Sequence, residues 1–221
     1  FWVKITIMEN ALIRKFSRPD RNRVREISCE TSFLGAPRKD IFADDELLAD
    51  ALTGYFTDYE PESCFVALVN RKVVGYLIGS KDVNNMSRVF SLKIMPGLLV
   101  KALKRNTLLG KVNLRFLFYY LSSLSKREFS MPDFSGEFPG ALHINIDQDY
   151  RGRGIGRLLI ENYLGYLREE KVSGVHFGSL SEGAKIFFTK MGFQVLFQGK
   201  RSYLKPYLGK EVNFYLFGKH L

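Results

Sequence analysis

The feature that most constrains the fold is a glycine- and arginine-rich stretch, DYRGRGIGRLLIENYL, which runs from Asp149 to Leu164. The residues before it, ALHINI, alternate in polarity as a β-strand does, and the residues after Gly156 repeat apolar side chains at helical spacing. The chain therefore passes from a strand through a glycine turn directly into a helix. Such a turn gathers backbone N–H groups at the positive end of the helix dipole, where a phosphate binds readily.

The residue types in this turn suit a phosphate ligand. Glycine places no Cβ in the path of the ligand, and the turn has three of them, Gly152, Gly154 and Gly156. Arginine adds charge and paired N–H donors, and the turn has Arg151, Arg153 and Arg157. Two phosphate motifs are excluded: G-x-G-x-x-G would need a glycine at Arg157, and the P-loop would need Gly-Lys-Ser/Thr. We therefore predict a pyrophosphate site; the alternative is a plain turn with solvated arginines.

The rest of the chain alternates between strand and helix patterns. Strands are expected at residues 11–16, 64–69, 72–80, 141–146, 174–180, 193–198 and 211–217. Helices are expected at residues 17–33, at residues 43–56, after the glycine turn and at residues 181–193. Asn70-Arg71 joins two strands in a tight hairpin, and residues 57–63 read as a loop because Pro61 moves Glu60 out of helical space. We expect a single domain over residues 1–221.

Residues 82–137 do not follow this alternation and form a predicted helical insertion. One helical stripe consists of Leu114, Leu117, Phe118, Leu121 and Leu124. A shorter helix before it is indicated by Leu98, Leu99, Ala102, Leu103 and Leu109. The charge-free runs are about ten residues long, whereas a membrane-spanning helix needs about 20. We favour a lid whose stripes pack on the sheet; the alternative is a basic surface for an acidic partner.

The positive charge of the chain is concentrated in the same region. Between Lys81 and Arg127 there are ten lysines and arginines and one acid, Asp82, so this segment carries nine of the ten net positive charges. Peripheral contact of residues 81–127 with an anionic surface is therefore a possible use of the charge. Nucleic acid is not favoured, because the aromatic residues of LRFLFYYL fit a core stripe better than a base-stacking platform.

Composition indicates a globular protein of a reducing compartment. Apolar residues make up 46% of the chain and aromatic residues 14%, enough for a buried core. The two cysteines, Cys29 and Cys64, have no zinc-site spacing and are too few for a disulfide framework. We expect no metal site and a cytoplasmic location.

Three segments together resemble the GNAT superfamily of acyl-CoA-dependent N-acetyltransferases. Arg151-x-x-Gly154-x-Gly156 resembles the family signature Q/R-x-x-G-x-G/A, and SEGAKIFFTKMGF is similar to the family helix N-x-x-A-x-x-F-Y-x-x-x-G-F. FVALVNRKVVGYLIGS resembles the second and third strands of the family. The resemblance covers about residues 11–80 and 138–218. FPGALHINIDQDYRGRGIG also resembles, more weakly, the acetyltransferase-like domains appended to some O-GlcNAcases.

The resemblance implies the fold and the way a cofactor binds. The fold would be α+β, with a mixed, mostly antiparallel sheet flanked by helices and a helical insertion between the third and fourth strands. Acetyl-CoA would be the acyl donor. Its pantetheine arm would bind the backbone of Ile144 and Ile146, and its pyrophosphate the N–H groups of Gly152, Arg153, Gly154, Ile155, Gly156 and Arg157. A small or peptidic primary amine would attack the thioester directly in a ternary complex, and an N–H near Asn145 or Ile146 would stabilise the oxyanion.

The sequence departs from the family pattern at two positions of its predicted cofactor site. Ser181 stands where asparagine is usual, and Phe188 stands where the family commonly has the tyrosine that protonates the departing thiolate. Phenylalanine cannot donate a proton, although a thiolate can take one from water. Phe188 therefore keeps open the alternative of a catalytically silent acyl-CoA-binding module. The basic block from Lys81 to Arg127 keeps open a second alternative, an acyltransferase that acts on a lipid or surface-bound substrate.

Two residues are candidates for the base that deprotonates the amine. His143 lies on the predicted cofactor strand and has a suitable ordinary pKa, although a hydrogen-bonded core histidine is the competing interpretation. Glu60 lies with Asp58 and Glu62 in the loop before the second strand, where the family often shapes its acceptor site. Strand alternation puts Asn145 on the same face as His143, where it would orient a water molecule.

Overall fold

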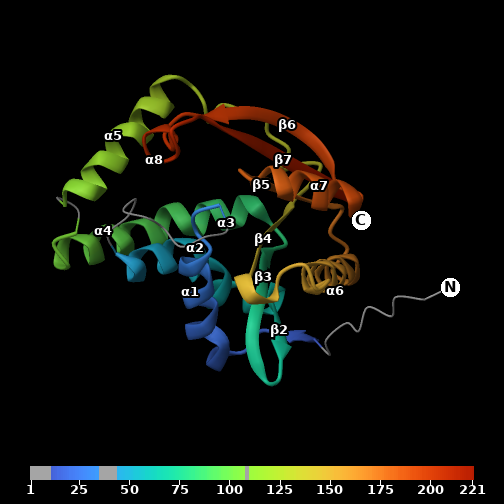
Figure 1. The fold of residues 1–221 in the computed structure, drawn as a ribbon. Coiled ribbons are helices and arrows are strands. Elements are labelled where there is room, and N and C mark those ends of the chain that lie inside the picture. The colour runs from blue at the N-terminus through green and yellow to red at the C-terminus, as the bar shows by residue number, and fades with distance from the viewer. Residues whose placement is uncertain (1–10, 35–43, 108–109) are drawn as a thin grey trace.

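A seven-stranded sheet forms the centre of the computed structural model, which describes residues 11–34, 44–107 and 110–221. In these residues the strand order is β1-β2-β3-β4-β5-β7-β6, and only the β4–β5 pair is parallel (Figure 1). The strands are β1 (Leu12–Lys15), β2 (Phe65–Val69), β3 (Lys72–Ser80), β4 (Gly140–Ile146), β5 (Gly174–Ser179), β6 (Gln194–Arg201) and β7 (Val212–His220). The predicted mixed, mostly antiparallel sheet is confirmed.

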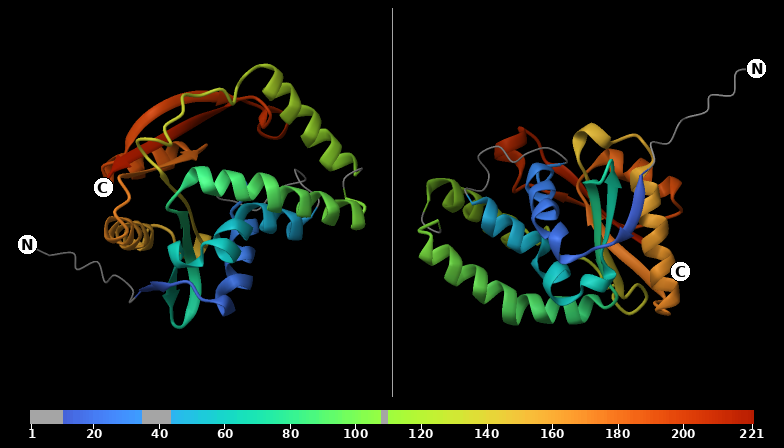
Figure 2. Two further views of the ribbon diagram at one scale, coloured as in Figure 1. Left: turned by 180° about the vertical axis from the view of Figure 1, so that it is seen from behind. Right: turned by 90° about the horizontal axis from the view of Figure 1, so that it is seen from below.

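Helices cover both faces of this sheet (Figure 2). One apolar cluster packs α6 (Ile155–Glu169) and α7 (Glu182–Lys190) on one face, and a second packs α1 (Arg21–Glu30) and α2 (Asp45–Tyr59) on the other. Short turns of helix precede α1, β2 and α6, namely η1 (Arg18–Asp20), η2 (Pro61–Ser63) and η4 (Gln148–Tyr150). The hairpin at Asn70-Arg71 is confirmed, and both residues have the positive φ that a tight turn between strands requires.

Helix boundaries differ from the prediction: α1 ends at Glu30 and α7 at Lys190, both before the predicted ends, and α2 runs beyond its predicted end. Residues 57–59 of the predicted loop belong to α2, which continues past Gly54 to Tyr59, and residues 61–63 form the helical turn η2. The chain leaves the helix at Glu60, whose φ of −141° and ψ of 51° are not helical. Pro61 restricts the residue immediately before it, and the helix therefore persists up to that residue.

Helices also form the connection between β3 and β4, as predicted. A continuous helical run joins α3 (Val83–Val89), the π-helical η3 (Phe90–Ile94) and α4 (Met95–Lys104), because the residues at both junctions keep helical dihedral angles. Pro96 lies in the first turn of α4 and has no N–H, which accounts for the altered hydrogen bonding just before it. The helix α5 (Lys111–Ser125) follows, and Leu109 lies outside the described residues.

The packing of the α5 stripe differs from the prediction. Leu114, Leu117, Phe118, Leu121 and Leu124 are all exposed. The helix instead turns a neighbouring face inward: Phe116 and Tyr120 contact the ring of Tyr203, and the Ser123 hydroxyl lies 3.1 Å from that of Ser202, just before α8 (Lys205–Leu208). The prediction that this stripe packs on the sheet is therefore wrong.

We predict that Gly79→Ala destabilises the fold by about 1–3 kcal/mol, the usual cost of overpacking a core. A Cβ at Gly79 would lie 2.2 Å from the Tyr163 hydroxyl oxygen, and Tyr163 is fully buried where α6 packs on β3 and β4. Urea unfolding measures the effect. Gly165→Ala is the matched control in α6, since a Cβ there meets nothing within 4 Å. Equal stability of the two variants would contradict the prediction.

Candidate functional site

The strands β4 and β5 pair over only two residues and then separate. Gly140 pairs with Val175 and Ala141 with His176, whereas the other edge of β4 stays paired with β3 as far as Ile146 opposite Gly75. Beyond Ala141, the β5-side edge of β4 has no strand partner within the described ranges. An extended ligand can hydrogen-bond to such an edge as an added strand does. This free edge includes Ile144 and Ile146, whose backbone the family resemblance assigns to the pantetheine arm.

The glycine turn follows directly at the end of β4. Gly152 has φ 74° and Gly154 has φ 81°, left-handed values that strongly favour glycine. Gly154 is the N-cap residue of α6, and the first helical hydrogen bond runs from the Leu158 N–H to its carbonyl at 3.2 Å. The N–H groups of the first three helical residues therefore lie at the helix start without an intrahelical acceptor.

The third glycine serves close packing. A Cβ at Gly156 would lie 3.2 Å from Ile146 Cδ1 and 3.4 Å from the ring of Phe187. At Gly152 and Gly154, by contrast, a Cβ would meet no atom of the protein within 4 Å, so the backbone angle alone demands glycine at these two positions. The turn is thus held against both β4 and α7, and it stays open towards solvent at its glycines.

The arginines of the turn are exposed and bonded locally. Arg151 Nε donates to the Ile146 carbonyl at 2.9 Å, which ties the turn back to the end of β4. Arg153 donates to the Asp149 carbonyl at 2.7 Å, and Arg157 to the Glu161 carboxylate at 2.7 Å, one helical turn further on. The turn therefore combines three guanidinium groups with the N-terminus of α6, an arrangement that attracts anions.

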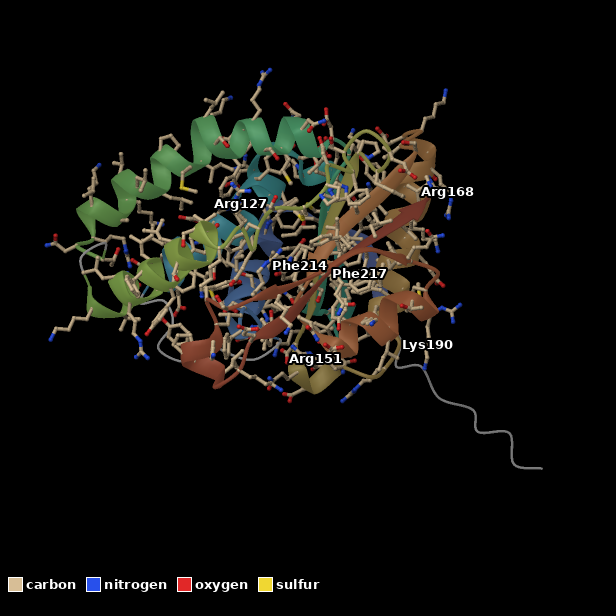
Figure 3. The ribbon with its side chains drawn as sticks, turned by 90° about the horizontal axis from the view of Figure 1, so that it is seen from above. Arg127, Arg151, Arg168, Lys190, Phe214 and Phe217 are labelled. Atoms are coloured by element: carbon tan, nitrogen blue, oxygen red, sulfur yellow. The ribbon has the colours of Figure 1, made fainter. Side chains whose placement is uncertain are left out.

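A basic cavity of about 270 Å³ lies beyond Arg157, between α6, α7 and the end of β7. Its charged side chains are four cations and one carboxylate, Arg157, Arg168, Lys190, Lys219 and Glu161, with Leu164 and Met191 as the apolar part. Figure 3 shows Arg168 and Lys190 on the same flank of the molecule. Sequence reasoning missed this cavity, because its residues come from three elements that only the tertiary structure brings together.

His143 lies on the other side of β4, in a polar group with Asn145 and Tyr76. The Asn145 amide nitrogen is 2.9 Å from the Tyr76 hydroxyl and 2.9 Å from His143 Nε2. Because an amide N–H only donates, Nε2 is the acceptor and the imidazole is neutral. Burial lowers the pKa of His143 to about 4 and raises the pKa of Tyr76. The contact confirms that His143 and Asn145 share a face of the strand.

Glu60 is a buried structural acceptor. Only 6% of the residue is exposed, and its carboxylate accepts hydrogen bonds from the Tyr55 hydroxyl at 2.8 Å, the Ser63 hydroxyl at 2.6 Å, the Ser80 hydroxyl at 2.7 Å and the Lys81 N–H at 2.7 Å. Four donors match the capacity of a carboxylate, which leaves no lone pair for an amine. The neighbouring Asp58 is paired with Arg21 at 2.9 Å. The hydrogen bonds of Glu60 thus tie the end of α2 to the end of β3.

The two departures from the family pattern have clear structural roles. Ser181 is the N-cap residue of α7, and its hydroxyl accepts from the Ala184 N–H at 3.3 Å. Phe188 is 5% exposed and packs in an aromatic cluster, with its ring centre 4.4 Å from that of Phe177. Phe193 and Phe217 complete this cluster. The roles of Ser181 and Phe188 in cofactor binding stay predictions.

Neither cysteines nor metal ligands form a second site in the described residues. Neither Cys29 nor Cys64 forms a disulfide within the described residues, and burial raises the pKa of Cys64 to about 12, which makes this thiol unreactive. No group of three or more His, Cys, Asp or Glu side chains in the described part of the chain could hold a metal ion. None of the described helices is both long enough and apolar enough to cross a bilayer.

Comparisons with known proteins agree on one fold. The model of the Acetyltransferase (GNAT) family matches residues 23–193. The solved structure of SsHAT aligns at 23% identity with a TM-score of 0.70, over 95% of this chain and 98% of its own. A polyamine N-acetyltransferase of Drosophila melanogaster, described as forming N-acetylagmatine, aligns at 18% identity with a TM-score of 0.55, over 96% of this chain and 100% of its own.

A third structure of similar fold is the ribosomal-protein-alanine N-acetyltransferase of Brucella melitensis. It aligns at 19% identity with a TM-score of 0.57, over 95% of this chain and 99% of its own. A comparison with curated protein sequences finds no match. At these identities the structural likenesses show the fold, and the predicted fold class is confirmed.

We predict that His143 makes the fold lose stability between pH 6.5 and pH 4. Its pKa of about 4 lies below the ordinary histidine value, so the unfolded chain binds the proton first as the pH falls. Between pH 7 and pH 5 this preferential protonation of the unfolded chain lowers the free energy of unfolding by about 2 kcal/mol. Urea unfolding at both pH values should show a smaller loss for His143→Gln than for the wild type. His220→Gln is the exposed control, and equal losses in the wild type and His143→Gln would refute the idea.

Proposed function

The chain belongs to the GNAT family of acetyltransferases, and we propose that it transfers an acetyl group from acetyl-CoA to a primary amine by direct attack in a ternary complex. The observation that carries the proposal is the junction of two features: the free edge of β4 and the left-handed glycine turn that follows it. The free edge of β4 would bind an extended arm, and the glycine turn would bind phosphate. A pantetheine arm linked to a pyrophosphate has this shape.

The residues of the junction fit the donor from one end to the other. The backbone of Ile144 and Ile146 would bind the pantetheine amides along the edge of β4. The N–H groups from Gly152 to Arg157 would bind the pyrophosphate at the start of α6. CoA carries a further phosphate on its ribose, and the basic cavity beside Arg157 offers Arg168 and Lys190 for it.

The bound thioester would supply the acetyl group and a thiolate leaving group, and the chain would supply the remaining roles. A backbone N–H near Asn145 or Ile146 would stabilise the oxyanion. Of the two candidate bases, His143 is better supported than Glu60, because four donors already fill the Glu60 carboxylate. The one lone pair of the neutral imidazole, on Nε2, accepts from the Asn145 amide, so we propose that this amide turns away before a water molecule passes the amine proton to Nε2. Water would also protonate the thiolate, since Phe188 cannot.

The acceptor is a small or peptidic amine in this proposal. Two proteins of similar fold are described as acting on such groups, one forming N-acetylagmatine and one acetylating a ribosomal protein. We also propose a cytoplasmic location, where thiols such as those of Cys29 and Cys64 are kept reduced.

A catalytically silent CoA-binding module is the second candidate function. It is favoured by one observation, the aromatic core packing of Phe188 in place of an acidic hydroxyl. Thiol release from acetyl-CoA, measured with a panel of primary amines, separates the two. If the protein binds acetyl-CoA tightly but releases no thiol from it with any amine of the panel, the enzyme proposal is rejected in favour of the CoA-binding module.

We predict that Gly154→Glu weakens acetyl-CoA binding at least about tenfold, because it places a carboxylate at the helix start that phosphate would occupy. Isothermal titration calorimetry measures the affinity. Gly209→Glu is the matched control, because Gly209 also has a left-handed φ, 74°, with nothing within 4 Å of its Cβ position. Unchanged binding by folded Gly154→Glu would remove the support for the phosphate site.

A further prediction assigns the ribose phosphate to the basic cavity. The double variant Arg168→Gln/Lys190→Gln should bind CoA roughly five- to tenfold more weakly, because two charge-assisted contacts to phosphate are lost. Dephospho-CoA, which lacks that phosphate, should bind the wild type and the variant alike. Lys72→Gln, at the distant β2–β3 hairpin, is the control. Equal weakening for both ligands would show that the cavity does not take this phosphate.

A further inference from the structure

The helices between β3 and β4 expose a large apolar surface. Leu92, Met95, Leu99, Val100 and Leu103 are between 41% and 70% exposed on η3 and α4. On α5, the five residues of the leucine stripe are between 43% and 67% exposed. Scattered exposed leucines are ordinary, but ten large exposed apolar side chains concentrated on two successive helices call for a partner. We call these ten residues the apolar face.

The apolar face follows one side of each helix. Met95, Leu99 and Leu103 recur every four residues along α4, while Ala102 on the adjacent side is buried. On α5, the stripe from Leu114 to Leu124 lies beside the side that packs on Tyr203. Each helix is therefore anchored by one side and leaves its apolar side uncovered by the described parts of the chain.

Cations flank the apolar face, and acids are absent from the helices that carry it. Residues 83–127 contain nine lysines and arginines and neither aspartate nor glutamate. Within the described residues, two of the nine form ion pairs: Lys101 binds Asp50 at 2.6 Å, and Arg105 binds Asp44 at 2.5 Å. The other seven are Arg88, Lys93, Lys104, Lys111, Arg115, Lys126 and Arg127. Among these seven, Lys93 and Arg115 lie over the rings of Tyr59 and Tyr207, and Lys126 donates to the Ser202 hydroxyl at 3.3 Å. Lys81, just before this segment, is paired with Glu170 at 3.0 Å, so the expectation that the whole basic block is available for a partner is corrected to these seven.

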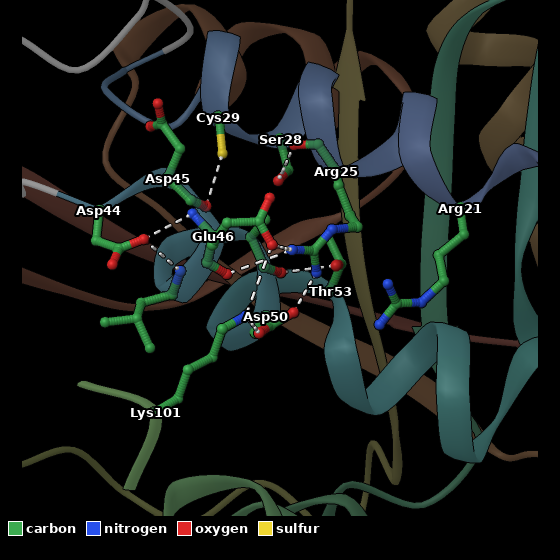
Figure 4. Close-up of polar contacts among 12 residues, drawn as sticks. Arg21, Arg25, Ser28, Cys29, Asp44, Asp45, Glu46, Asp50, Thr53 and Lys101 are labelled. Carbon is green, nitrogen blue, oxygen red and sulfur yellow. Dashed lines mark hydrogen bonds and ion pairs between the residues drawn. The ribbon is translucent and has the colours of Figure 1, made fainter. Parts of the chain in front are cut away.

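The internal ion pairs hold α4 in a fixed orientation. Arg25, 8% exposed, binds Glu46 at 2.7 Å and also Asp50, which Lys101 reaches from α4 (Figure 4). This network joins α1, α2 and α4 through partly buried charges, which stay ordered better than surface pairs do. Figures 1 and 2 show α4 and α5 on the side of the sheet opposite α6. The helices that carry the apolar face thus lie across the sheet from α6, whose N-terminus carries the glycine turn.

We propose that the apolar face of α4 and α5 docks the protein on an anionic lipid bilayer. Apolar side chains would enter the boundary of the acyl chains, and the seven flanking cations would lie among acidic headgroups, as in interfacial amphipathic helices. No described helix is able to span the bilayer, so the contact is peripheral. Charge complementarity favours this partner over a second copy of the chain, since self-association would bring seven cations against seven.

The proposal goes beyond the proposed acetyl transfer, and vesicle co-sedimentation of the full chain tests it. Vesicles with roughly a quarter phosphatidylserine in about 0.1 M salt should bind the protein at least tenfold more strongly than vesicles of phosphatidylcholine alone. Raising the salt to about 0.5 M should weaken the binding, because the electrostatic part is screened. Acetyl-CoA affinity is measured on the same samples, so failure of the cofactor site and failure of docking are separate results.

Two variants of the face carry the test, each with a matched control. Leu103→Ser/Phe118→Ser removes two side chains that are 64% and 67% exposed, and Leu12→Ser removes one that is 62% exposed on β1. Lys104→Gln/Lys111→Gln removes two flanking cations, and Arg18→Gln/Lys72→Gln removes two exposed cations elsewhere. Each face variant should lower vesicle binding at least about tenfold, from the lost apolar burial or the lost charge. The controls should stay within about twofold, and acetyl-CoA affinity should not change.

Three results would overturn the proposal. One is equal binding to anionic and neutral vesicles, or to neither. Another is wild-type binding by both face variants. The third is a concentration-dependent dimer, seen by analytical ultracentrifugation, that Leu103→Ser/Phe118→Ser converts to monomer, since a second copy would then cover the face.

Discussion

The parting of β4 from β5 is the constraint on which the candidate site depends. The two strands meet where Gly140 and Gly174 approach so closely that a Cβ on Gly140 would lie 3.0 Å from the Gly174 carbonyl. Each half of the sheet is complete on its own side, since β4 pairs with β3 over six residues and β5 with β7 over six. The halves can therefore separate after two residue pairs without leaving either strand alone, and the free edge of β4 is the result.

The helix α6 connects this edge to the rest of the molecule. The Tyr163 hydroxyl lies within hydrogen-bonding distance of the Ser80 carbonyl at 3.1 Å and of the Ala141 carbonyl at 2.7 Å, so it bridges the ends of β3 and β4. The Ser80 hydroxyl in turn donates to Glu60. One chain of hydrogen bonds thus runs from α2 through β3 to α6, whose N-terminus carries the glycine turn. This continuity explains why a carboxylate in a predicted acceptor loop is buried and saturated with donors.

Local patterns in the sequence predicted local structure well. The Asn70-Arg71 hairpin, the glycine turn and the order of strands and helices each depend on neighbouring residues, and the structure has all three. Contacts between residues that are far apart in the sequence could not be predicted from it. The donors to Glu60 include Ser80 and Lys81, about twenty positions away, and the basic cavity gathers side chains from α6, α7 and β7. The α5 stripe shows the same limit, because helical periodicity places apolar residues on one side and does not say what covers that side.

The segment that carries the apolar face leaves the sheet and returns to it at neighbouring points. The Val83 N–H donates to the Pro139 carbonyl at 2.8 Å, so the first residue of α3 and the residue before β4 are held together. Asp82 caps α3 by accepting from the N–H groups of Asn84 and Asn85. The helices therefore leave and rejoin the sheet beside each other, and the pairing of β3 with β4 does not depend on the outer faces of α4 and α5. Substitutions on those faces can accordingly alter what the surface binds while the strand edge beside Ile144 keeps its geometry.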